Sequence, residues 1–310
     1  MTTAEPLPEE TGCVASIGVF DGVHRGHQSL LALARSRADA LGLPLVAITF
    51  DPHPMAVVGP RRAPTSLASL AHRVELLGAA GADRVDVLAF DESLASMDPV
   101  AFIGHVLVDR LHVREVVVGQ DFRFGHGAAG TFDTLDAEGR RLGFRATSAP
   151  LTGDGPERWS STYARSLISD GDVAAAAEVL GRPYRLDGVV VHGDHRGREL
   201  GYPTANLRWD APDPGPAVPA DGVYAGRLHV LDGDLPAAIS VGTNPQFGGQ
   251  ERRVESYVLD RDDLDLYGLE VGVSFVERIR GQQTFDSVPD LVLRMSADVE
   301  RVRAILGLPG

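Results

Sequence analysis

The sequence predicts two joined folds: a parallel α/β fold over residues 1–182, and a small antiparallel β-barrel with a C-terminal helix over residues 183–310. Two observations support this division. Up to Gly181, short apolar runs alternate with amphipathic runs of helical length, which is the pattern of strands joined by single helices. After Gly181 the apolar runs are short, rich in Val, Leu and Tyr, and separated by Gly, Pro and Asp, which is typical of a small barrel.

The elements of the first fold follow from these runs. The expected strands are Val14–Phe20, Leu45–Phe50, Val85–Phe90, Glu115–Val118 and Phe144–Ser148. The expected helices are Gln28–Leu41, Leu67–Ala80, Pro99–Leu111, Thr131–Leu142, Tyr163–Ser169 and Val173–Leu180. Strands connected in this way form a parallel sheet with helices on both faces, and such sheets bind ligands beyond the carboxyl ends of their strands. We therefore expect functional residues in the loops after Phe20, Phe50 and Val118.

The second fold has five expected strands and one helix. The strands are Leu186–His192, Tyr224–Leu231, Ala237–Val241, Val254–Leu259 and Leu269–Val276, and the helix is Pro289–Leu306.

The composition excludes several classes of protein. The chain has 29 basic and 43 acidic residues and a formal net charge of −14, which argues against nucleic-acid binding through a broad basic face. Every basic residue is arginine, and the lack of lysine excludes a Walker A loop, a protein-kinase fold and a pyridoxal-phosphate Schiff base. Cys13 is the only cysteine, which excludes an intramolecular disulfide. No run approaches the roughly 18 apolar residues of a membrane span, so we expect a cytoplasmic protein that does not bind membranes.

The most informative segment follows the first expected strand and opens the first helix. It reads Gly18-Val19-Phe20-Asp21-Gly22-Val23-His24-Arg25-Gly26-His27. Two histidines three residues apart lie on one side of the first turn, near the positive end of the helix dipole. The glycines let the backbone come close to a ligand, so the segment predicts a polyphosphate site. His-x-x-His alone also fits an exposed helix face or half of a metal site.

Three further segments lie where a parallel sheet would place a ligand. They are Phe50-Asp51-Pro52-His53-Pro54, Gly119-Gln120-Asp121-Phe122-Arg123-Phe124-Gly125, and Ser160-Ser161-Thr162 with Arg165. Thr162 and Arg165 are three residues apart, so a hydroxyl and a guanidinium can bind one polyphosphate. The alternative for the Ser-Ser-Thr run is a helix N-cap, and both can hold together.

These segments resemble the nucleotidylyltransferase superfamily, and the Phe-Asp-Gly before His24 resembles FMN adenylyltransferases in particular. The resemblance implies a Rossmann-like sheet that transfers AMP from ATP to FMN. It implies that His24, His27 and Arg165 stabilise charge on the α-phosphate and the leaving group. It also implies a set of residues that bind FMN and ATP: Gly18, Phe20, Asp21, Gly22, Asp51, His53, Asp121, Phe122, Phe124, Ser161 and Thr162.

A second constellation lies in the barrel half. Gly197-Arg198-Glu199-Leu200-Gly201-Tyr202-Pro203-Thr204-Ala205-Asn206 falls between the first two expected barrel strands. Pro-Thr-Ala-Asn alone is a weak, turn-like motif, but preceded by Gly-x-x-x-Gly it resembles the riboflavin kinase motif. The resemblance implies that Gly197, Gly201, Thr204 and Asn206 bind Mg-ATP, with Mg²⁺ held by Thr204 and Asn206. It further implies substrate binding by Arg280 and a general base at Glu255, a position where a solvated carboxylate on an exposed strand face is the alternative.

Together the motifs resemble the bacterial bifunctional riboflavin kinase/FMN adenylyltransferase family over residues 14–306. The family implies ATP-dependent conversion of riboflavin to FMN and of FMN to FAD, with Mg²⁺ at both sites. It implies small-molecule partners and a monomer or weak homo-oligomer. Gln246, Trp159 and Asp121 depart from the usual pattern. Two rival functions are a flavin-binding sensor that has lost catalysis, and a nucleotidyltransferase for another acceptor with the barrel as a binding module.

Overall fold

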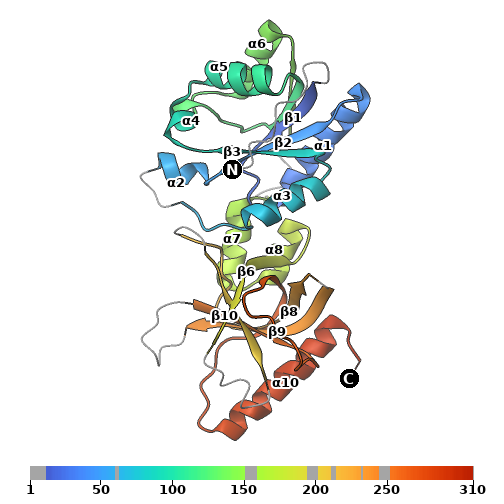
Figure 1. Ribbon diagram of the computed structural model, residues 1–310, viewed down its shortest axis with the longest axis vertical. Helices are drawn as coiled ribbons and strands as arrows, with labels where there is room; N and C mark the ends of the chain where they lie inside the picture. The colour runs from blue at the N-terminus through green and yellow to red at the C-terminus, as the bar shows by residue number, and fades with distance from the viewer. Residues whose placement is uncertain are drawn as a thin grey trace. The chain divides into compact units, whose positions relative to one another are not determined.

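The computed structural model describes residues 12–59, 63–150, 159–193, 202–210, 214–231, 233–243 and 252–309. The chain forms two compact units (Figure 1). The first comprises Met1–Pro64 and Leu70–Trp159, and the second comprises Thr65–Ser69 and Ser160–Gly310.

The first unit is built on a five-stranded parallel sheet, as the sequence predicts. Its strands are β1 (Cys13–Ile17), β2 (Leu45–Asp51), β3 (Arg84–Ala89), β4 (Val113–Gly119) and β5 (Arg145–Ala149). Their order across the sheet is β3-β2-β1-β4-β5, and all four neighbouring pairs are parallel. The strand order therefore reverses between β1 and β4, which makes that point the topological switch where such sheets bind ligands.

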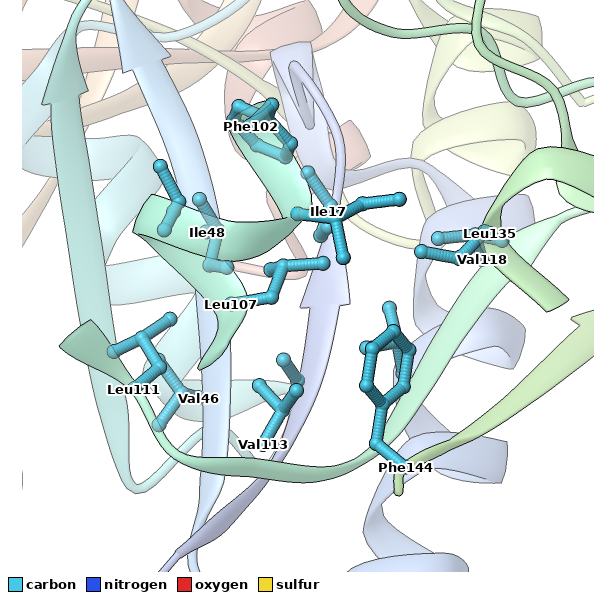
Figure 2. Close-up of a cluster of buried hydrophobic side chains, with 14 of the residues drawn as sticks. Ile17, Val46, Ile48, Phe102, Leu107, Leu111, Val113, Val118, Leu135 and Phe144 are labelled. Carbon is cyan, nitrogen blue, oxygen red and sulfur yellow. The ribbon is translucent and has the colours of Figure 1, made fainter. Parts of the chain in front are cut away.

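Both faces of this sheet are buried, because successive side chains of a strand point to opposite faces. On one face Ala15 and Ile17 of β1 belong to a cluster (Figure 2) with α5 (Pro99–Phe102), the π-helix η2 (Ile103–Arg110) and α6 (Phe132–Leu142). On the other face Val14 belongs to a cluster with α1 (Arg25–Leu41) and α3 (Leu70–Ala79). The apolar runs that predicted β1, β2 and β4 are nearly continuous because almost every residue of these central strands is buried.

Several elements of the first unit differ from the expectation. The helix expected over Pro99–Leu111 is a turn of α-helix followed by π-helix. Four short turns were not expected, because three to five residues carry no helical period. They are η1 (Asp21–Val23), α2 (Pro54–Val58), α4 (Glu92–Ser96) and η3 (His126–Ala128).

The second unit contains a closed barrel with strand order β10-β7-β6-β11-β8-β9. The strands are β6 (Tyr184–Val191), β7 (Thr204–Arg208), β8 (Gly222–Val230), β9 (Gly233–Thr243), β10 (Arg252–Val258) and β11 (Glu270–Arg280). The helix α10 (Val288–Leu306) follows, as predicted. The barrel and its helix confirm the expected fold. Strand β7 was not expected, because its five residues include Thr, Asn and Arg and lack an apolar run.

The helices α7 (Ser161–Asp170) and α8 (Val173–Leu180) belong to the second unit. Helix α8 contacts β6 and β11, and its Val173, Ala176, Val179 and Leu180 are at most 4% exposed. A strap, Thr65–Ser69, also joins this unit, since Ser66 pairs with the backbone around Pro216 and Ser69 donates to Asp187. The domain boundary between residues 182 and 183 stays a prediction.

These contacts predict where a stable barrel fragment begins. A fragment of residues 184–310 lacks α8 and exposes the barrel surface that this helix covers, whereas a fragment of residues 160–310 keeps it. Burying one Val or Leu side chain contributes roughly 1.5–3 kcal/mol, and about 1 kcal/mol shifts a melting temperature by several degrees. We expect the shorter fragment to melt at least about 5 °C lower, as measured by circular dichroism. Equal melting temperatures would show that α8 adds nothing to the barrel.

Candidate active sites

The first candidate site lies at the carboxyl edge of the parallel sheet. Strand β1 lies between β2 and β4, so the loops after these three strands meet at one edge. They carry Gly18 to Gly22, then Asp51 and His53, and then Asp121, Phe122 and Phe124. These are the three loops in which the sequence predicted functional residues.

The loop after β1 is tightly wound. Phe20 (φ 52°) and Val23 (φ 39°) both have left-handed backbones, and Gly22 between them has φ 74°. The Phe20 side chain is only 1% exposed and packs in the α1 core cluster. Phe20 was expected to bind substrate, but a buried ring cannot meet a ligand, so its backbone alone could do so.

The two histidines lie together at the start of α1. His24 is the N-cap, and its Nδ1 accepts a hydrogen bond of 3.3 Å from the backbone N–H of His27. The two rings stack with their centroids 3.6 Å apart, and the edge of the Phe20 ring lies against His27 at 5.2 Å. A Cβ on Gly26 would lie 3.0 Å from the His24 ring, so a larger residue would disturb this stack. The i, i+3 spacing thus brings the rings together, as expected.

His27 has a polar atom that its own surroundings leave unsatisfied. Its Nδ1 is buried and has no hydrogen-bond partner in the part of the chain that the structure describes. Burial lowers the pKa of His27 well below its usual 6.5, and the charge of a protonated His24 lowers it further. The ring is therefore neutral at neutral pH, and it offers one hydrogen-bond donor and one acceptor rather than a fixed positive charge.

The other expected residues of this unit have structural contacts as well. His53 is the N-cap of α2, with its Nδ1 accepting from Met55 N–H at 3.1 Å. The rings of Phe122 and Phe124 stack at 5.3 Å, and both pack on the α6 side of the sheet. Phe124 is only 8% exposed, so most of its ring packs in the core, and a part in ligand binding stays a prediction.

Ser161, Thr162 and Arg165 lie in the first two turns of α7. Ser160 is the N-cap of this helix and accepts from Tyr163 N–H at 3.1 Å, which fits the N-cap alternative. Arg165 Nε donates to the carbonyl of Thr65 in the strap at 2.6 Å. These residues belong to the second unit, so their meeting with the two histidines stays a prediction.

Arg73 on α3 also contacts the loop after β1. Its side chain is 7% exposed, and its guanidinium donates to the carbonyl of Val19 in the loop after β1 at 3.1 Å. Its other terminal nitrogen is 3.7 Å from Oδ1 of Asp51. No local motif marks this position, because the contact depends on how α3 packs on the sheet.

The second candidate site is formed by two neighbouring antiparallel strands of the barrel. In the register of β7 and β10, Asn206 lies opposite Glu255, and Thr204 lies opposite Tyr257. Thr204 Oγ1 donates to Oε2 of Glu255 at 3.4 Å. The structure therefore brings together three predicted residues, two of which are 51 positions apart in the sequence. Gly197 and Gly201 lie outside the described residues.

A pocket opens beside Thr204. Ser256, which is 1% exposed, contributes to its wall, and the Ser256 hydroxyl has no hydrogen-bond partner within the described ranges. The pocket is lined mainly by apolar side chains, with one aromatic ring: Val190, Pro203, Thr204, Ala205, Ser256, Val258, Arg261, Asp262, Leu264, Leu266 and Tyr267.

Arg280, expected to bind substrate, has a structural partner. Its Nε and terminal nitrogen donate to the Asp298 carboxylate of α10 at 2.9 and 2.7 Å, and its side chain is 10% exposed. The arginine therefore joins β11 to α10, and a part in substrate binding stays a prediction.

In the described ranges, no three His, Cys, Asp or Glu side chains cluster as a metal site. No helix in them is both long enough and apolar enough to pass through a bilayer.

The first unit has a parallel sheet with two histidines at a helix N-terminus. The second has a barrel with a hydroxyl, an amide and a carboxylate on adjacent strands. Together these features define a two-domain nucleotide-dependent transferase. Family models agree: that of FAD synthetase matches residues 7–163, and that of riboflavin kinase matches residues 180–306. The chain is 38% identical over 299 residues to the bifunctional riboflavin kinase/FMN adenylyltransferase of Pseudomonas fluorescens, covering 96% of this chain and 94% of that one. It is 37% identical over 302 residues to the Escherichia coli (strain K12) protein of the same name, covering 97% and 95%. The chain belongs to the bifunctional riboflavin kinase/FMN adenylyltransferase family.

Among solved structures, the chain is similar to a protein named as a macrolide-efflux protein from Streptococcus pneumoniae. The TM-score is 0.83, the identity is 34%, and 94% of each chain is covered. The likeness supports the fold. Both family models and the curated relatives name flavin enzymes, and not efflux proteins. The chain is thus a bifunctional enzyme with an N-terminal FAD synthetase domain and a C-terminal riboflavin kinase domain, which confirms the predicted function.

The lowered pKa of His27 predicts a pH dependence of stability. Below about pH 6.5 the unfolded chain binds a proton at His27 that the folded chain does not, so acid favours the unfolded state. The free energy of unfolding of the N-terminal domain should fall as the pH drops below 6.5, by at most about 1.4 kcal/mol per pH unit from this group. His27→Gln should remove that part of the slope in denaturant unfolding between pH 7 and pH 5. An NMR titration showing His27 protonated at pH 6.5 would contradict this.

Proposed function

We propose that the central residues of each active site are ones that a single domain brings together. The N-terminal domain transfers AMP from ATP to FMN at His24 and His27, and the barrel transfers the γ-phosphate of ATP to riboflavin at Thr204, Asn206 and Glu255. The observation that supports this proposal is that the expected residues of each site lie together. The rings of His24 and His27 stack on each other. In the barrel, Thr204, Asn206 and Glu255 meet on two neighbouring strands.

At the N-terminal site, a phosphate oxygen of FMN attacks the α-phosphorus of ATP, a new P–O bond forms, and pyrophosphate leaves. The attacking phosphate is already anionic at neutral pH, so no general base is needed. Catalysis is electrostatic: the two histidines, the α1 N-terminus and Arg165 stabilise the negative charge on the α-phosphate and the leaving group. The unsatisfied Nδ1 of His27 supports this role, because a phosphate oxygen bound through a proton on this atom would satisfy it. We assign flavin and nucleotide binding to Gly18, Asp21, Gly22, Asp51, His53, Asp121, Phe122, Phe124, Ser161 and Thr162.

In the barrel, the 5′-hydroxyl of riboflavin attacks the γ-phosphorus of ATP, a new P–O bond forms, ADP leaves, and Glu255 accepts the hydroxyl proton. Transfers of this kind pass through a loose transition state that needs positioning and charge neutralisation more than a strong base. The contact from Thr204 to Glu255 supports a shared site. The pocket beside Thr204, with apolar side chains, a few polar groups and the ring of Tyr267, suits a nucleotide base.

The oxygen donors of Thr204 and Asn206 fit Mg²⁺, a hard cation that takes one or two protein oxygens and completes its shell with water and substrate phosphates. We propose that these residues hold the magnesium that accompanies ATP. The metal would neutralise charge on the phosphates during transfer. The N-terminal site would likewise use Mg-ATP. Other parts of the proposal are a cytoplasmic location, action as a monomer or weak homo-oligomer, and no binding to nucleic acid, which the net charge of −14 supports.

One incubation separates this function from its rivals. The purified chain with riboflavin, ATP and Mg²⁺ should yield FMN and then FAD, resolved by chromatography. A flavin-binding sensor would yield neither product. A nucleotidyltransferase for another acceptor, with the barrel only as a binding module, would also yield neither product.

His27→Ala should lower the rate of FAD formation from supplied FMN by about 10²–10³, the scale for losing one preorganised charge-stabilising group. FMN formation from riboflavin by the same protein should be unchanged, because the barrel has its own site. Both rates are measured by chromatography on one preparation. An equal loss of the two activities would assign His27 to folding.

Glu255→Gln should lower kcat for FMN formation by at least about 10², because removing a general base typically costs 10²–10⁴. The glutamine oxygen can still accept from Thr204, so we expect little change in melting temperature. FAD formation from supplied FMN should be intact. Glu270→Gln, at an exposed carboxylate of β11, is the matched control. A near-normal kcat in Glu255→Gln would show that Glu255 is instead a solvated carboxylate on an exposed strand face.

A further inference from the structure

Arg73 is a buried cation at the carboxyl edge of the sheet that the proposed chemistry does not use. It lies on α3, outside every motif of the sequence, and its side chain is 7% exposed. Its Nε is buried and has no hydrogen-bond partner in the described ranges. A charged side chain is costly to bury, so its position calls for a reason.

The first contact of Arg73 is with the loop that carries the histidines. The carbonyl of Val19 accepts two hydrogen bonds, one from Arg73 at 3.1 Å and one from Thr49 Oγ1 of β2 at 2.9 Å. The next residue, Phe20, has a left-handed backbone, a conformation that persists only where the surroundings fix it. Arg73 and Thr49 thus fix the chain at the residue before this bend.

The bend is connected directly to the histidine pair. The Phe20 ring lies edge-on to His27, and His27 stacks on His24. A shift of Val19 would therefore reach both imidazoles through two ring contacts. The loop is tightly packed, so it has little freedom to absorb such a shift elsewhere.

The second contact joins the neighbouring loop. A terminal nitrogen of Arg73 lies 3.7 Å from Oδ1 of Asp51, which ends β2. Burial lowers the pKa of Arg73, and the charges of Asp21 and Asp51 oppose that shift. One guanidinium therefore connects the loop after β1, which leads to His24 and His27, with the end of β2, which carries Asp51.

We propose that Arg73 is a positioning residue for adenylyl transfer: it holds the Val19–Val23 turn against the end of β2, and so sets the places of His24 and His27 without touching either substrate. The inference rests on the proposed role of the histidine pair. Arginine suits this task because its planar group donates in two directions at once, whereas lysine donates from a single nitrogen.

The test uses Arg73→Met and Arg73→Lys in the full chain, with FMN formation by the barrel as an internal reference. Misplacing a catalytic group by about 1 Å can cost 10²-fold in rate. We expect Arg73→Met to lower kcat for FAD formation by about 10², and Arg73→Lys, which can keep the Val19 contact alone, by about 10-fold. The loss should fall mainly on kcat and less on KM for FMN, since the residue acts on the histidine pair and reaches the substrate only through Asp51.

Arg84→Met is the matched control. Arg84 is a partly buried arginine of the same sheet, paired with Asp86 at 2.6 Å, but it begins β3 and so lies at the opposite, amino edge. The Arg84→Met protein should lose stability and keep its kcat for FAD formation. If Arg84→Met and the Arg73 variants lose kcat alike, or if Arg73→Lys keeps normal kcat, the inference is wrong. Should Arg73→Met fail to fold, the lysine variant decides.

His27→Ala, assayed in parallel, separates this inference from the proposed function. If His27→Ala lowers FAD formation and the Arg73 variants do not, the positioning role alone is overturned. If His27→Ala has normal activity, the proposed role of the pair fails, and the inference fails with it.

Discussion

The N-terminal site depends on a turn whose backbone is unfavourable by itself. Phe20 and Val23 both have positive φ, which costs about 1–3 kcal/mol for each such residue. The same two side chains are 1% exposed, and burying an apolar side chain contributes about 1.5–3 kcal/mol. Core packing therefore offsets the strain, and the turn places His24 at the N-cap of α1. A motif residue that looks like a ligand contact, Phe20, contributes by holding the turn.

In the barrel the corresponding constraint is strand register. Val254, Ser256 and Val258 of β10 are buried, whereas Glu255 and Tyr257 alternate with them and are partly exposed. A slip of one residue would turn Glu255 into the core and move it away from Thr204 and Asn206. The apolar alternation that stabilises the barrel is thus also what sets the position of the proposed base. On β10, the stability of the barrel and the position of Glu255 therefore cannot be varied separately.

Most of the fold could be predicted because long apolar and amphipathic runs fix strands that are buried on one or both faces. Short elements could not. Strand β7 has five residues, and pairing with β6 and β10, rather than its own composition, makes it a strand. The histidine pair could be predicted because i, i+3 spacing is local. The Arg73 contacts could not, since they join residues 54 and 22 positions apart through tertiary packing. Arg280 has a tertiary partner of the same kind, Asp298, that no local pattern reveals.

The nature of each nucleophile explains why the two sites differ. A phosphate monoester has a second pKa near 6 and needs no base at neutral pH, so a site that attacks with FMN can bury a neutral imidazole. A hydroxyl must lose its proton during attack, so the barrel needs a proton acceptor, the role proposed for Glu255. A partly exposed strand face suits such an acceptor, whereas burial at the carboxyl edge of a parallel sheet would disfavour the charged form of a carboxylic acid. The parallel sheet and the barrel therefore each suit one of the two reactions.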